Sequence, residues 1–426
     1  MSDAASGAGH GSVLKLLGTA AVIGIAAGAG AIAFLGLEHN LTSLLWDDLP
    51  EVLGGTPGWW VFLVLGVGAV GVWGALKLPG HGGHRPLDGL GTSTGPKVIG
   101  SVLVAALISL SIGAVVGPEA PLMGVGSAIG GAIAFKAREQ GKQVLMIAGS
   151  VAAITMILGN PMISAVLVLE AAVLKGGPGG RRVMVGLLPV MIAMGFGYLI
   201  QIGVGDWDGV GQAQLQVPGL PAYDTVQGID LAMALVVGLV SAVFAVLAVE
   251  AGTRFQDRVR NPLTGLLAAA MIVATMAVAA RAVTGESVDL VLFSGQSAIG
   301  SALTITSVSV LLVIAVAKTI AYAVSLGAGF RGGMVFPAVY LGVVVATGAS
   351  QLVTGSNLSA LAAAGMAAAV SGVMRLPFTG VLLALLLCAG AGMAVTTPAI
   401  IGAVIGVLVR FVADEKLAPQ EVAAPE

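Results

Sequence analysis

Residues 117–121, Gly-Pro-Glu-Ala-Pro, place a single carboxylate between two long apolar stretches, 102–116 and 122–135, neither of which carries a charge. Stretches of this kind are buried in a bilayer or a protein core. A lone Glu at such a depth costs a few kcal/mol even on the most lenient insertion scale. The sequence therefore predicts a functional role for Glu119, and the fold has to accommodate a charge at that depth.

The two prolines beside Glu119 predict where a helix begins. Pro118 and Pro121 suit the first turn of a helix, where the missing N–H groups are not needed. A helix that begins inside a membrane leaves the N–H groups of Glu119 and Ala120 unpaired, and together with the helix dipole these attract an anion. The Glu119 carboxylate is itself an anion. It could occupy that position, compete with a permeating ion and leave when protonated.

The composition extends this interpretation to the whole chain. Of 426 residues, 57% are hydrophobic and 9% are charged, and the mean hydropathy of +1.02 is beyond that of ordinary soluble domains. The apolar stretches have the length of helices and lack the alternation of an outer-membrane barrel. We expect an all-α integral membrane protein of the multi-pass type, and its 64 glycines suit close helix packing.

The order of apolar and polar stretches predicts two membrane halves. Pro161, after Gly159-Asn160, and Pro377, after Arg375-Leu376, are expected to interrupt helices within the bilayer. The expected segments are a polar N-terminal segment (1–12), a first membrane half (13–204) whose first span is 13–37, an acidic external loop and linker (205–230), a second membrane half (231–412) and a short cytoplasmic tail (413–426).

An internal repeat relates these halves. Sliding the sequence by 216 positions pairs Pro121 with Pro337 and Pro161 with Pro377, and the same shift pairs several glycines and alanines without a gap. Two proline pairs at one offset favour a duplication over chance matches in a Gly- and Ala-rich chain. The second copy of the Glu119 motif is 333–337, Gly-Met-Val-Phe-Pro. If the copies are inverted, two helix N-termini meet near the middle of the bilayer.

The residues expected to bind an anion follow from these two motifs and from the loop before them. The candidates are Gly83, His84, Gly117, Ala120, Met334, Val335 and Phe336. His81 and His84 lie three residues apart among glycines, with no third ligand beside them, so the sequence favours a loop or pore-lining role over a metal site.

At these residues the chain resembles the chloride channel and proton-coupled chloride transporter (CLC) family. Residues 318–342, beginning KTIAYAVSLGAGFRGGMVFP, resemble the longest motif of that family, and 117–121 resemble its G-[KR]-E-G-P. Residues 160–170 resemble N-x-P-L-x-G-x-L-F-x-x-E, and 375–380 resemble R-x-P-L-T-G. The motifs span about residues 80 to 410 in the order of the family.

The resemblance implies a homodimer with one anion pathway in each subunit, and each subunit built from two inverted halves with broken and re-entrant helices. Glu119 matches the gating glutamate of the family, and Met334 and Val335 match residues whose amides hold the central anion. Gly83 falls at the position of the pore serine. The internal proton-carrying acid of the transporters is Ala171 here, with Glu170 adjacent.

Several positions depart from the family pattern. Pro118 replaces the basic residue of the gating motif and Ala120 replaces its second glycine. Gly83 has no hydroxyl, and the last apolar stretch has no tyrosine to supply the usual second hydroxyl. The expected function is transport of chloride or a similar monovalent anion through a pathway gated by Glu119, channel-like or loosely coupled to protons. Fluoride export and strict chloride/proton antiport are the alternatives within the family.

Other classes of function fit less well. A carrier for cations or other solutes would need helix C-termini or further acids in the second motif, and an enzyme would need paired acids or a nucleophile with its base. Another interpretation is that Glu119 simply pairs with Lys318 or Arg331, although we expect Lys318 to lie at a helix end and reach the interface. Glu250 and Arg254 have the spacing of an ion pair on one helix.

No cofactor is expected besides the transported anion and, in a coupled mechanism, protons, and no metal site or nucleic-acid partner is predicted. The expected surroundings are the lipid bilayer of the plasma (inner) membrane and a second copy of the chain.

Overall fold

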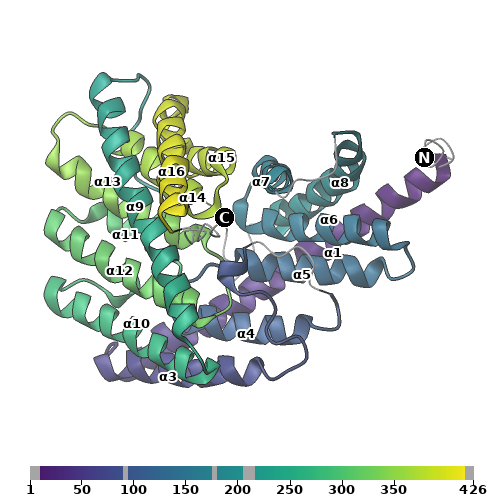
Figure 1. The fold of residues 1–426 in the computed structure, drawn as a ribbon, viewed down its shortest axis with the longest axis horizontal. Coiled ribbons are helices and arrows are strands. Elements are labelled where there is room, and N and C mark those ends of the chain that lie inside the picture. Colours follow the sequence, from purple (N-terminus) through teal and green to yellow (C-terminus); the bar gives the residue numbers. More distant parts are fainter. Residues whose placement is uncertain (1–9, 90–94, 175–179, 205–215, 418–426) are drawn as a thin grey trace, which may run out of the picture.

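The computed structural model describes residues 10–89, 95–174, 180–204 and 216–417 (Figure 1). Within these ranges the regular structure is helical, apart from one isolated β-bridge between Gly117 and Gly333. In this described part, nine helices are long and apolar enough to cross a membrane. The prediction of an all-α membrane protein is confirmed.

The first half begins with a long helix and contains the first of the predicted breaks. Helix α1 continues through a π-helical turn, Leu44–Asp48, into the short α2 (Leu49–Val52), and a 3-10 turn, Pro86–Asp88, follows α3. The main helices are α1 (His10–Ser43), α3 (Gly58–Ala75), α4 (Ile99–Ser111), α5 (Glu119–Ile133), α6 (Glu139–Leu158), α7 (Pro161–Leu174) and α8 (Gly180–Val204).

The second half repeats this order. Short 3-10 turns occur at Val288–Leu290, Ala389–Ala391 and Met393–Val395. The helices are α9 (Gly228–Arg258), α10 (Pro262–Thr284), α11 (Ile299–Thr304), α12 (Val308–Ala328), α13 (Val335–Leu352), α14 (Leu358–Met374), α15 (Pro377–Leu387) and α16 (Thr396–Leu417).

The repeat found in the sequence is confirmed at the level of whole helices. Helices α5 and α13, and α7 and α15, begin at positions 216 residues apart. They also pack in the same way: α1 lies against α8 as α9 lies against α16, and α5 against α6 as α13 against α14. Figure 1 shows most of the first half on the right and most of the second on the left, with α3 and α10 side by side at the bottom.

Glycine pairs at equivalent positions allow the closest of these helix crossings. A Cβ at Gly126 on α5 would overlap the carbonyl of Gly149 on α6, and a Cβ at Gly342 on α13 would overlap the backbone of Gly365 on α14. Helix axes come this close only where side chains are absent. The two crossings hold α5 and α13 rigidly, and these are the helices that begin inside the molecule.

The predicted break after α6 is confirmed. Gly159 caps the end of that helix with a left-handed backbone conformation, φ 62°, and Pro161 begins α7. Two predicted boundaries move outward: α1 extends beyond 13–37 to Ser43, and α16 continues past 412 to Leu417. Helices end where their hydrogen bonds end rather than where hydrophobicity ends, so both run into more polar sequence. Residues 205–215, in the predicted acidic loop, lie outside the described ranges.

The prediction that Lys318 reaches the interface is wrong. Lys318 lies near the middle of α12 with no exposed surface, and its Nζ donates to the carbonyls of Leu292 (2.6 Å) and Phe293 (2.9 Å). Those carbonyls follow the 3-10 turn Val288–Leu290 and belong to no helix, so they need donors from elsewhere in the protein. The buried amino group of Lys318 supplies them.

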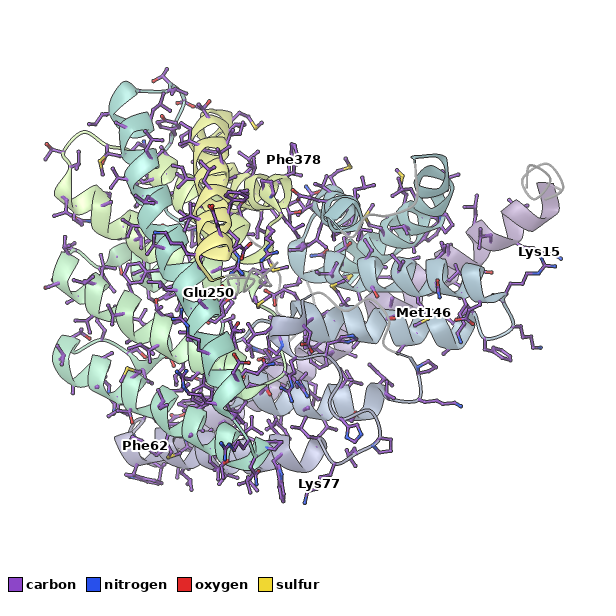
Figure 2. All side chains as sticks on the ribbon, viewed as in Figure 1. Lys15, Phe62, Lys77, Met146, Glu250 and Phe378 are labelled. Atoms are coloured by element: carbon purple, nitrogen blue, oxygen red, sulfur yellow. The ribbon has the colours of Figure 1, made fainter. Side chains whose placement is uncertain are left out.

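The predicted pair between Glu250 and Arg254 is also replaced by a contact across helices. Glu250 on α9 forms an ion pair with Arg410 of α16, with 2.9 Å between Oε1 and Nη1 and both side chains largely buried, while Arg254 is exposed. Figure 2 shows Glu250 on the side of α9 that faces α16. Packing of α9 on α16 brings the largely buried Arg410 close to Glu250. An ion pair with this buried side chain is more favourable than one with a solvated arginine on the same helix.

Candidate functional site

Two short loops, each following a helix, carry the chain to the starts of α5 and α13. These break loops are residues 113–118 and 329–334, and they are equivalent under the 216-residue shift. Each begins with a glycine in the left-handed region, Gly113 at φ 88° and Gly329 at φ 86°, a conformation that costs glycine little. The glycines end the preceding helices and turn the chain back into the protein.

The two break loops bond to each other through equivalent residues. Gly117 N–H donates to the Gly333 carbonyl at 2.9 Å and Gly333 N–H donates to the Gly117 carbonyl at 2.5 Å. Reciprocal bonds between equivalent residues place a pseudo-two-fold axis between the loops, as expected for inverted halves. The predicted meeting of two helix starts is confirmed.

Buried serines add a second pair of equivalent bonds between the halves. Ser325 on α12 accepts from Val115 N–H at 3.1 Å, and Ser109 on α4 accepts from Arg331 N–H at 2.9 Å. Each serine belongs to one half and each amide to the other. The four bonds fix the break loops relative to each other.

Glu119 is the first residue of α5 and is fully buried at this junction. Its Oε1 accepts from the Phe336 N–H of α13 at 2.9 Å, and the Val335 N–H also acts on the carboxylate. A Cβ at Gly117 or at Gly333 would overlap the carboxylate, so both glycines leave space for it. The carboxylate thus occupies the position that the start of α13 offers to an anion.

The interpretation that Glu119 merely pairs with a cation is wrong. Within the described ranges the ion pairs are those of Arg375 with Asp414 and of Arg410 with Glu250 and Asp414. Lys318 and Arg331 donate to backbone carbonyls instead. The second oxygen of Glu119, Oε2, has no hydrogen-bond partner in the described part of the chain. A carboxylate held only by helix amides can be displaced by another anion.

Of the second motif, the Phe336 and Val335 N–H groups act on this carboxylate, and Met334 immediately precedes them. Met334 caps α13, and its carbonyl accepts from the hydroxyl of Tyr322 at 2.7 Å, so the loop is held from the side of α12. Val335 and Phe336 form the first turn of α13 and are buried.

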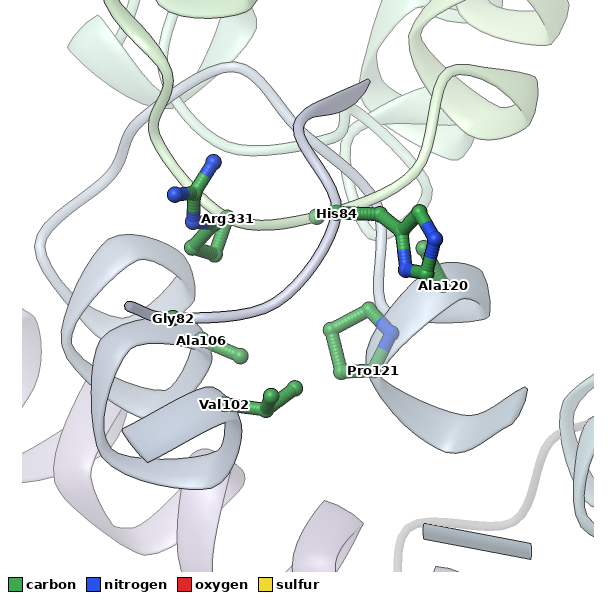
Figure 3. A pocket seen from close by; sticks show the side chains of 8 residues that line it. Gly82, His84, Val102, Ala106, Ala120, Pro121 and Arg331 are labelled. Carbon is green, nitrogen blue, oxygen red and sulfur yellow. The ribbon is translucent and has the colours of Figure 1, made fainter. Parts of the chain in front are cut away.

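A small pocket of about 30 Å³ lies beside the start of α5 (Figure 3). His84 and Ala120, both predicted, are among its walls, with His84 standing over Ala120 and Pro121 in Figure 3. Gly82 is among the lining residues, whereas the predicted Gly83 is not. The complete lining is Gly82, His84, Val102, Ala106, Ala120, Pro121, Arg331 and Gly332.

Glu170 performs a structural task that the sequence does not reveal. It is on α7 and accepts from the N–H groups of Phe378 (2.9 Å) and Thr379 (2.8 Å) and from the Thr379 hydroxyl (2.7 Å), at the start of α15. Figure 2 shows Phe378 at the edge of α15 nearest α7. The carboxylate is thus the cap of a helix in the other half. Ala171 beside it is partly buried against the core.

Sequence reasoning did not identify Arg331 as a pocket residue, nor Ser109, Ser325 and Tyr322 as supports of the break loops. The 216-residue register contains a signal for the serines, because it pairs Ser109 with Ser325 and Val115 with Arg331. Their partners become evident only when the halves are docked.

Comparison with known proteins identifies this architecture. A family model described as voltage gated chloride channel matches residues 81–410, which include both break loops, Glu119 and Glu170. The chain belongs to this family, the CLC family. This CLC protein is therefore an integral, multi-pass membrane protein of a family of ion channels and transporters that move anions.

Curated relatives agree with this assignment. The putative ion-transport protein YfeO of Escherichia fergusonii is 26% identical over 350 residues, 78% of this chain and 78% of the relative. The YfeO of Salmonella paratyphi A is 24% identical over 352 residues, 78% of this chain and 80% of the relative.

Solved structures share the fold. A slow cyanobacterial Cl⁻/H⁺ antiporter matches with a TM-score of 0.75 at 19% identity, covering 94% of this chain and 95% of the other. A CLC-type fluoride/proton antiporter matches with 0.68 at 18% identity, covering 94% and 96%. A eukaryotic CLC transporter matches with 0.71 at 14% identity, covering 94% and 72%.

Proposed function

We propose that this CLC protein moves chloride or a similar monovalent anion across the membrane through a pathway that the side chain of Glu119 gates. One observation carries the proposal: the Glu119 carboxylate accepts from the first turn of α13 at the point where the two break loops meet. Helix amides with no full positive charge bind an anion loosely enough to release it. A carboxylate in that position blocks a passing anion until it leaves.

We expect protonation to release the Glu119 side chain from this position. The ionised carboxylate is attracted to the start of α13, whereas the neutral acid is not. As pH falls, the protonated fraction grows, the side chain leaves its position and an anion takes the amides. Anion flux through this CLC protein is therefore expected to rise as pH falls.

Flux from proteoliposomes loaded with chloride tests the gate. Glu119→Gln removes the charge at every pH, so we expect flux at neutral pH to match or exceed that of the unmodified protein at acidic pH, and to change little between the two. Glu139→Gln, at an exposed acid in the first turn of α6, is the matched control and should keep the pH dependence. If the Glu119→Gln protein keeps both the low chloride flux at neutral pH and the pH dependence of the unmodified protein, Glu119 is not the gate.

The proposed transport is channel-like or only loosely coupled to protons. Two features support this: Ala171 has no titratable side chain, and three hydrogen bonds hold Glu170 at the start of α15. The test is proton movement into proteoliposomes against a pH gradient, driven by a gradient of chloride or of fluoride. Sustained uphill proton movement in a fixed ratio to the anion would contradict loose coupling, and a response to fluoride alone would assign fluoride as the substrate.

The same proposal includes a homodimer in the plasma membrane, with one pathway in each subunit, and neither a cofactor nor an enzymatic activity. Family membership supports it. Linked dimers that carry Glu119→Gln in one subunit are expected to show the sum of two independent fluxes. If the flux of the linked dimer differs from the sum of the fluxes of its two kinds of subunit, the subunits do not have separate pathways.

A further inference from the structure

Arg331, in the second break loop, is a buried cation that the gating mechanism does not use. Only 6% of its surface is exposed. Its Nη2 donates to the His81 carbonyl at 2.9 Å, while Nε and Nη1 have no hydrogen-bond partner among the described residues. Arg85 and Asp88, on the loop that precedes α4, act on the guanidinium with opposite signs, and neither forms an ion pair with it. A buried and unpaired guanidinium is costly, so it needs a reason.

The fold does not supply that reason. The residue equivalent to Arg331 in the first half is Val115, and it occupies the same framework: its N–H donates to Ser325 as the Arg331 N–H donates to Ser109. Each residue lies in a break loop, two positions before the glycine that bonds to the other loop. Since an apolar side chain serves in one copy, the break loop does not require a charge at this position.

The pocket lined by Arg331 exists because the first half carries small residues where the second carries large ones. Val102, Ala106 and Ala120 line it. The residues equivalent to them are Lys318, Tyr322 and Phe336, and all three are fully buried, so the matching space in the second half is occupied by side chains. The asymmetry opens a space on one side of the junction only, and Arg331 and His84 are both among its lining residues (Figure 3).

Gly82 fits the loop closely around the guanidinium. It has φ 73°, and a Cβ there would come 2.8 Å from Arg331 Nε. Its N–H donates to Ser101 at 3.2 Å, which holds the loop in place. The loop before α4 is thus shaped to leave room for Arg331 beside the pocket.

We propose that Arg331 is an anion-binding residue: its positive charge, not neutralised by an ion pair within the described ranges, holds an anion in the pocket that it helps to line, beside the position gated by Glu119. The proposal rests on the proposed anion transport and names a determinant of its affinity and selectivity. The chain lacks hydroxyls at the two positions where the family supplies them, and a guanidinium is a stronger, charge-assisted donor. Its fixed charge favours anions that accept several hydrogen bonds.

Two measurements on purified protein test this. Crystals of the unmodified protein grown in bromide should show an anomalous peak in the pocket, within hydrogen-bond distance of Arg331. In detergent, Arg331→Gln should weaken chloride binding measured by calorimetry by about tenfold or more, and Arg331→Lys by less, because a hydrogen bond to a charged group is lost or replaced. Arg258→Gln, at an exposed arginine that ends α9, is the matched control and should bind as the unmodified protein does.

The outcomes separate this inference from the gating proposal. Bromide found only beside Phe336, or chloride binding unchanged in a folded Arg331→Gln protein, overturns the role of Arg331 while leaving the Glu119 gate intact. If Arg331→Gln does not fold, the bromide map of the unmodified protein decides alone. Bromide in the pocket of a protein that moves no anion would support the site and contradict the transport.

Discussion

The carboxylate of Glu119 fits between the two break loops because residues 117 and 333 have no side chain. The space for the carboxylate depends on these two glycines, since a Cβ on either of them would overlap it. The same two glycines make the reciprocal backbone bonds that join the loops. The two glycines therefore leave the space that the Glu119 carboxylate occupies and also form the backbone bonds that border it.

Replacement of one of these glycines offers a test that keeps the acid. In Gly333→Ala the new methyl group meets the carboxylate of Glu119, the end of a side chain that can move, so we expect Glu119 to be expelled. Chloride flux at neutral pH should rise and its pH dependence should flatten, although the titratable group is still present.

Gly348→Ala on α13 is the control, because its methyl group would make ordinary contact with Leu311. Unchanged flux and pH dependence in Gly333→Ala would show that the carboxylate does not need this space.

At the scale of the helix, each start within the molecule needs a partner for its N–H groups, and two helices meet this need differently. At the start of α13 the Phe336 N–H donates to Oε1 of Glu119, and the Val335 N–H also acts on this carboxylate. The start of α15 is closed by three bonds from Glu170. Both begin near a proline and both receive a carboxylate from the other half. The two carboxylates differ in that Oε2 of Glu119 has no hydrogen-bond partner among the described residues, whereas both oxygens of Glu170 accept hydrogen bonds.

This difference predicts a stability effect without a gating effect. Glu170→Ala leaves the first N–H groups of α15 without their cap and should lower the free energy of unfolding by about 1–2 kcal/mol. The melting temperature in detergent should fall, while the pH dependence of anion flux persists. A pH dependence lost together with Glu170, at unchanged stability, would instead make this residue a carrier of protons.

At the scale of the whole molecule, two inverted copies of one framework meet at a pseudo-two-fold axis and then differ where function requires it. The bonds across the axis are equivalent, from Gly117 to Gly333 and from each serine to the opposite loop. The side chains around the axis are not: the first half contributes Glu119 and small pocket residues, and the second contributes Arg331. The symmetric bonds join the two helix starts, and the asymmetric side chains make the two sides of the junction chemically different.

The two serines test this division. Ser109→Ala and Ser325→Ala each leave one buried N–H without a partner and should lower stability by a similar amount, about 1–3 kcal/mol. Only Ser109→Ala is expected to weaken chloride binding, because its hydroxyl holds the backbone of Arg331, whereas Ser325 holds that of Val115. Thermal melting and calorimetry measure the two effects. Equal effects of both serines on binding would contradict the asymmetry.

Much of the architecture could be predicted from local sequence. Pro161 and Pro377 break helices because proline lacks an N–H group, and the apolar stretches form membrane helices because the bilayer demands internal hydrogen bonds. The register of 216 residues predicted which helices are equivalent, and the prolines at 118 and 121 predicted a helix start at Glu119. These features depend on neighbours in the chain or on a repeat that survives in the residues.

The tertiary structure alone decided which side chains meet. Lys318 bonds to carbonyls 25 and 26 residues away along the chain, Glu250 bonds to Arg410 of another helix, and Glu170 caps a helix of the other half. Arg331 shares a pocket with residues more than 200 positions before it in the chain. The sequence by itself determined where helices begin and break, since those rules act over a few residues. It did not determine these partners, because they depend on which helix faces cross when the two halves dock.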